Sequence, residues 1–164
     1  MLGFGLSLIT HLATYLGVNV ARHVPFVWLL HVGIFLGVVA MLIDAPSKAV
    51  GDWSDTGPNY WRGFFDPMPG WVRYLSYGLF AYVVINFVLF LVLSREGSPD
   101  VLNGKYVLRI DGKAEEERVV REITLAEYDL REARILRGFS GHWLIFYLCP
   151  ALFFWYSEKE ARED

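Results

Sequence analysis

Residues 71–94 have the sequence WVRYLSYGLFAYVVINFVLFLVLS, in which Arg73 is the only charged side chain. Residues 24–43 form a second apolar run, which holds no Lys, Arg, Asp or Glu. A helix of about 20 apolar residues crosses the hydrocarbon core of a bilayer, which is about 30 Å thick. Because lipid offers the backbone no hydrogen-bond partners, isolated apolar runs of this length are expected to be helical. The two runs predict an integral membrane protein.

The composition agrees with this class. Of the 164 residues, 54% are hydrophobic and 16% are aromatic, and the mean hydropathy is +0.33. The net charge of −3 argues against a nucleic-acid-binding protein, which would carry a basic excess. The single cysteine, Cys149, excludes an intrachain disulfide.

Two further apolar runs extend the predicted architecture. Residues 2–20 are separated from the second run by Ala21-Arg22-His23 only, so residues 1–43 are predicted to form a transmembrane helical hairpin. Residues 142–156 are short for a span and contain Pro150, so residues 141–157 are predicted to cross the membrane or to re-enter it. We therefore expect an all-α, four-helix transmembrane bundle, with three helices as the alternative, followed by a charged tail at residues 158–164.

The polar parts of the chain lie between these runs. Residues 44–70 are rich in Pro, Gly and aromatic side chains, which predicts a loop at the membrane surface. Residues 105–110 and 118–123 alternate in polarity and predict two strands. Thr124 and Glu127 have the spacing of a capping box, which predicts a helix from Leu125. Residues 95–140 are therefore predicted to form a small ββα insertion.

The basic residues predict the orientation of the chain. With four spans, ten of the 15 lysines and arginines fall on the side of residues 95–140, and five fall on the other side. Basic residues are enriched in cytoplasmic loops. Residues 95–140 are thus expected to be cytoplasmic and residues 44–70 extracytoplasmic, in a bacterial cytoplasmic membrane.

Four polar side chains within the runs are candidate functional residues, because polar groups in a membrane require partners or a function. Counted along the helices, His11, His31, Asn86 and Cys149 fall in one layer, roughly 10–14 Å below the cytoplasmic surface at about 1.5 Å per residue. Tyr82 lies one helical turn from Asn86, on the same face. Such a layer could bind haem or a transition metal through imidazole, or relay protons. The alternative is that these groups connect helices by hydrogen bonds.

Small residues predict where helices approach closely. Gly33 and Gly37 form a GxxxG pattern, which serves close helix packing or a homodimer. Folding residues 1–43 as a hairpin places Gly33 opposite His11 and Gly37 opposite Ser7. His31 would then point away from His11, towards Asn86 on the helix of residues 71–94.

The segment Arg137-Gly-Phe-Ser-Gly-His142 precedes the last apolar run. Its two glycines predict a bend. Arg137 and His142 could contact lipid phosphate, or the segment could be an interfacial hinge with Trp143 as its anchor.

The sequence contains no HExxH, GxSxG, P-loop or paired CxxC motif, and it indicates no catalytic residue and no metal site. The leading hypothesis is a non-enzymatic scaffold or accessory subunit. It would contact the lipid bilayer and a membrane or cytoplasmic protein partner. The alternative is a redox or proton-handling membrane protein that uses His11 and His31.

Overall fold

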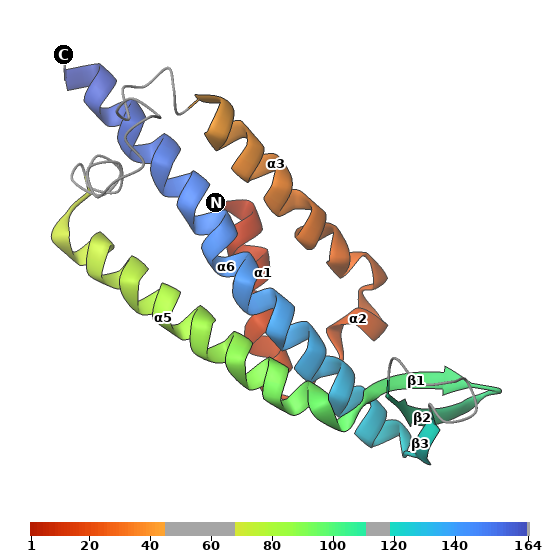
Figure 1. The fold of residues 1–164 in the computed structure, drawn as a ribbon. Helices are drawn as coiled ribbons and strands as arrows, with labels where there is room; N and C mark the ends of the chain where they lie inside the picture. Colours follow the sequence, from red (N-terminus) through yellow and green to blue (C-terminus); the bar gives the residue numbers. More distant parts are fainter. Residues whose placement is uncertain (45–67, 111–118, 164) are drawn as a thin grey trace.

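The computed structural model describes residues 1–44, 68–110 and 119–163, and it is mostly helical with a small sheet (Figure 1). Three helical segments are long and apolar enough to cross a membrane: Pro25–Asp44, Gly70–Glu96 and Leu125–Tyr156. Helix α1, Leu2–Tyr15, rises only about 21 Å at about 1.5 Å per residue, which is short for a full span. The helix lengths therefore support the alternative of three membrane-spanning helices over four. The predicted loop at residues 44–70 falls largely outside the described residues.

Helix α6, Leu125–Glu163, is the central element. Helices α1, α3 (Leu29–Asp44) and α5 (Gly70–Leu93) each pack mainly against α6 (Figure 1). Trp143, whose side chain is fully buried, and Leu136 form the core between α6 and the second apolar run. The prediction of a hairpin in which α1 packs chiefly on α3 is therefore wrong, since both helices use α6 as their common partner.

Helix α6 is continuous through the segment in which a bend was predicted. It contains both Gly138 and Gly141, and it passes through Pro150 without ending. Residues 95–140 and 141–157 are thus not separate structural units. In a packed helix, neighbouring groups can satisfy the backbone that a proline leaves free.

The glycines of α3 also face α6. A Cβ atom added to Gly33 would collide with the hydroxyl group of Tyr147, and one added to Gly37 would lie 3.6 Å from Pro150. The tyrosine hydroxyl donates a hydrogen bond to the Leu30 carbonyl at 2.8 Å. The GxxxG pattern therefore marks close packing, as expected, but its partner is the last helix and not α1.

The connection between α1 and α3 is fixed to the first part of α6. It consists of α2, Val20–His23, and a 3₁₀ turn, η1, Pro25–Trp28. Asn19 caps α2 by accepting a hydrogen bond from the Arg22 backbone, and its amide donates to Asp129 at 2.9 Å. Arg22 pairs with the same carboxylate at 2.7 Å.

The insertion contains three strands in the order β1-β2-β3, not the two predicted. The missed strand, β1 (Ser98–Leu102), pairs antiparallel with β2 (Lys105–Arg109), which pairs with β3 (Val119–Glu122). Asn103 and Gly104 connect β1 to β2 with φ values of 50° and 77°. An Asn-Gly pair with positive φ at both positions is typical of a type I′ hairpin turn. This dipeptide is the signal in the sequence that indicates β1.

Two contacts connect the sheet to the first turn of α6: a helix cap and a pair of aromatic rings. The Thr124 hydroxyl accepts a hydrogen bond from the Glu127 backbone N–H at 3.1 Å, so the predicted N-cap is present. The rings of Tyr106 in β2 and Tyr128 in α6 lie 4.9 Å apart. A short turn, η3 (Ser94–Glu96), connects α5 directly to β1. The sheet therefore lies at the end of the helices where α5 ends and α6 begins (Figure 1).

Candidate functional site

His11 is the centre of a buried polar network that joins α1, α5 and α6. Its side chain is only 2% exposed. The Nδ1 atom lies 2.8 Å from Ser140 Oγ, and Nε2 lies 2.5 Å from Tyr82 Oη. Because Ser140 donates to the Arg137 carbonyl at 3.3 Å, its oxygen is left to accept the Nδ1 proton, and Nε2 then accepts from Tyr82. A neutral imidazole therefore satisfies every group in the network.

The network continues from Tyr82 towards the surface. Tyr15 Oη lies 2.7 Å from Tyr82 Oη, and the Tyr15 side chain is exposed. The guanidinium of Arg137 lies 4.8 Å from the centre of the Tyr15 ring. A cation at this distance over an aromatic ring is attracted to it. The result is a chain of hydrogen bonds that leads from a buried histidine to an exposed phenol beside an arginine.

Asn86 connects α5 to α6 at the same level. Its amide donates to the carbonyl oxygens of Arg137, at 3.1 Å, and Gly138, at 3.3 Å. This contact requires small residues on α6: a Cβ atom on Gly141 would collide with the Asn86 amide nitrogen, and one on Gly138 would lie 2.6 Å from Phe90 Cγ. The two glycines that suggested a bend therefore serve a helix crossing.

His31 belongs to a different contact. Its Nδ1 atom accepts a hydrogen bond of 2.9 Å from the Trp143 indole N–H, and its ring lies 5.8 Å from that of Phe139. His11 and His31 thus contact different residues of α6, and His31 does not point to Asn86 as predicted. Trp143 is likewise a core residue here and not an interfacial anchor.

The candidate residues Ser7 and His142 are buried and partly buried between helices, respectively. Ser7 is fully buried, and its hydroxyl has no hydrogen-bond partner among the described residues. His142 Nδ1 donates to the Gly138 carbonyl at 2.8 Å, and its ring packs against Phe87 at 4.7 Å. These contacts turn His142 towards α5 and away from Arg137.

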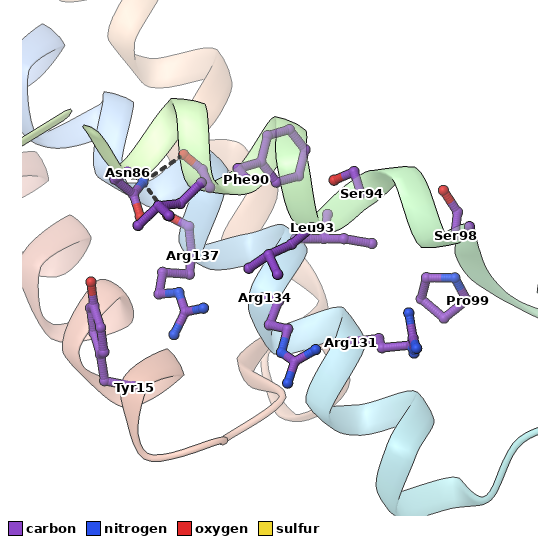
Figure 2. A pocket seen from close by; sticks show the side chains of 14 residues that line it. Tyr15, Asn86, Phe90, Leu93, Ser94, Ser98, Pro99, Arg131, Arg134 and Arg137 are labelled. Carbon is purple, nitrogen blue, oxygen red and sulfur yellow. Dashed lines mark hydrogen bonds between the residues drawn. The ribbon is translucent and has the colours of Figure 1, made fainter. Parts of the chain in front are cut away.

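A pocket of about 160 Å³ opens beside this network, between α5, α6 and the start of β1 (Figure 2). Arg137 and Tyr15 line it, together with Arg131 and Arg134. Neither Arg131 nor Arg134 was among the candidate residues. The signal for them in the sequence is the spacing of three arginines, three residues apart, immediately before an apolar run.

Within residues 1–44, 68–110 and 119–163, no group of three or more His, Cys, Asp or Glu side chains could hold a metal ion. No protein-family model matches the sequence, and neither a curated protein nor a solved structure is significantly similar to it.

Proposed function

We propose that this chain is a non-enzymatic integral membrane protein, a scaffold or accessory subunit that binds a protein partner through its sheet region. Three helical segments would cross the membrane as a bundle: α6, with Pro25–Asp44 and Gly70–Glu96 packed against it. The distribution of lysine and arginine supports a cytoplasmic location for residues 95–140. In this arrangement the sheet projects from the cytoplasmic end of the helices.

Lipid would account for the exposed apolar side chains of the helices, but not for those of the sheet region. Val101 and Leu102 are 49% and 41% exposed at the tip of the β1–β2 hairpin, which extends away from the helices (Figure 1). Leu125, at the start of α6, is 40% exposed. Val101 and Leu125 line one groove, and exposed apolar residues that lie together are typical of an interaction surface.

A groove beside the hairpin is the observation that carries the proposal. It has a volume of about 290 Å³ and lies between the α1–α2 connection, the hairpin and the first turns of α6. Its apolar lining includes Val101, Tyr106 and Tyr128, and its polar lining includes Arg22 and Glu132. An apolar centre with a charged rim is the usual composition of a protein interface.

The internal polar groups fit a structural role. His11, Asn86 and His31 each hydrogen-bond to α6, and each comes from a different helix packed on it. Such bonds between membrane helices contribute about 0.6–2 kcal/mol each. Their contribution supports a scaffold that holds its cytoplasmic surface in a fixed position.

The proposal is tested by placing a photo-crosslinking amino acid at Val101, which is exposed and lines the groove, and, as the control, at Arg95, which is also exposed but lies outside the groove. In native membranes we expect position 101 to give one discrete cross-linked protein and position 95 to give none. A cysteine introduced at Ser98 should be labelled from the cytoplasmic side. Cross-links from position 101 to lipid only would contradict the proposal.

The hydrogen-bond chain favours a second candidate function, proton transfer. The chain from His11 through Tyr82 to Tyr15 contains only groups that can both donate and accept a proton. If the protein conducts protons, vesicles that contain it should lose a pH gradient faster than empty vesicles. Tyr82→Phe should abolish this leak, whereas Tyr74→Phe, at an exposed position of α5, should preserve it. No leak in the unaltered protein would exclude this function.

A further inference from the structure

We propose that the pocket lined by Arg131, Arg134 and Arg137, hereafter the arginine pocket, binds the phosphate of an anionic phospholipid. The three arginines follow one another along α6, and the end of α5 forms the opposite wall (Figure 2). This proposal is independent of the partner-binding role of the sheet, because the arginine pocket and the groove beside the hairpin share no lining residue.

Two of the three arginines in the arginine pocket are available to bind an anionic ligand. Arg131 is paired within the chain: its guanidinium lies 3.0 Å from Glu127 and 3.1 Å from Glu96, and its side chain is only 12% exposed. In the described part of the chain, Arg134 and Arg137 have no carboxylate partner. Both are partly exposed to the pocket. Guanidinium groups without a carboxylate partner are well suited to bind phosphate oxygens.

The arginine pocket lies where a bilayer would place phosphate groups. No Lys, Arg, Asp or Glu occurs from Gly138 to Tyr156, and these residues rise about 28 Å at about 1.5 Å each, close to the thickness of a hydrocarbon core. Arg137 directly precedes this apolar stretch. The contact of Phe90 with Gly138 brings the end of α5 to the same level. The guanidinium groups would thus lie at the boundary between acyl chains and headgroups.

The walls of the arginine pocket fit a lipid better than a soluble phosphate compound. Leu89, Phe90 and Leu93 of α5 line one side, and Leu89 and Leu93 are 54% and 39% exposed. Acyl chains can therefore continue from the pocket along the outer surface of α5.

The structure positions one of the two available cations. The guanidinium of Arg137 lies over the Tyr15 ring, 4.8 Å from its centre, and the Arg137 carbonyl accepts a hydrogen bond from Asn86 at 3.1 Å. Arg134 lies between Arg131 and Arg137 along the helix (Figure 2). Binding would therefore require little reordering of Arg137, which favours affinity.

Native mass spectrometry of the full chain in detergent tests this proposal with dioleoyl phosphatidylglycerol and, as the zwitterionic comparison, dioleoyl phosphatidylcholine. We expect the anionic lipid to bind more tightly. Because a basic residue near the membrane surface contributes about 1 kcal/mol, Arg134→Gln and Arg137→Gln should each raise the apparent Kd about fivefold. Arg134→Lys keeps the charge but not the planar fork of donors, so it should lose less affinity than Arg134→Gln. Arg95→Gln, which removes the same charge outside the pocket, should leave the Kd unchanged.

Three outcomes would overturn the proposal. Equal binding of the two lipids would show that the pocket does not recognise net anionic charge. An equal loss of affinity in Arg95→Gln would show that attraction is non-specific. Displacement of the lipid by millimolar glycerol 3-phosphate would assign the pocket to a free phosphate compound. Circular dichroism of each variant, with helicity and melting temperature as in the unaltered protein, separates loss of binding from loss of fold.

Discussion

Replacing Trp143 by alanine is expected to lower the free energy of unfolding by about 3–5 kcal/mol, the usual cost of removing a large buried aromatic side chain. Trp143 is fully buried at the centre of α6, where it packs against the second apolar run and donates its indole N–H to His31. Truncation would open a cavity and leave the imidazole without its donor. Unfolding in mixed micelles with increasing SDS, followed by circular dichroism, measures the change.

Trp155 is the matched control, because it lies on the same helix and is 65% exposed. Trp155→Ala should change the free energy of unfolding by no more than about 0.5 kcal/mol, as is usual for surface positions. Trp143→Phe keeps most of the ring but removes the N–H, so it should cost about 1 kcal/mol for the lost hydrogen bond, in addition to a packing change. Equal effects of the two alanine substitutions would contradict the central position of Trp143.

Gly141→Leu is expected to cause the second large loss of stability. Any Cβ atom at this position collides with the Asn86 amide, and His11 Cε1 lies 3.5 Å away on the other side. The substitution would push α5 from α6 and break the two hydrogen bonds from Asn86 to the α6 backbone. Overpacking of this kind costs about 1–3 kcal/mol, and the lost hydrogen bonds add to it.

Gly78 offers the comparison, since it is an exposed glycine within α5 with no atom near an added Cβ. Gly78→Leu should therefore leave the SDS midpoint unchanged or raise it slightly, because glycine is a poor helix former. If Gly141→Leu and Gly78→Leu shift the midpoint equally, the close crossing of α5 and α6 is absent in the folded protein.

Much of the local structure follows from short patterns in the sequence. The apolar run at residues 71–94 corresponds to α5 within one residue at each end, and the Thr124 cap and the helix after it are present. The hairpin turn at Asn103-Gly104 was not predicted, although only a few residue pairs tolerate two positive φ values and this dipeptide is one of them. These features depend on interactions between residues close in the chain.

The candidate site was predictable only as a set of polar residues. Depth along the helices indicated His11 and Asn86, and helical spacing indicated Tyr82. The structure gives each of them a hydrogen-bond partner on another helix. His31, which was expected to point to Asn86, contacts Trp143 of α6 instead. Arg131 and Arg134 were missed because a charged face before an apolar run is usually solvated. The position of these arginines beside the end of α5 depends on the contact between Phe90 and Gly138, two residues that lie about fifty positions apart in the sequence.

The sequence by itself determined that the chain contains helices long and apolar enough to cross a membrane, since long apolar runs can satisfy their backbone in lipid only as helices. It also indicated where the second and third apolar helices begin and end. The tertiary structure decided that α6 is the central helix and that Gly33 and Gly37 face α6 and not α1. It also decided that Gly138 and Gly141 lie at the crossing with α5 and that three arginines share a pocket. The physical reason lies in the runs themselves. When nearly every face of a helix is apolar, hydrophobic periodicity no longer indicates which face is buried, and shape complementarity with the neighbouring helices makes that choice.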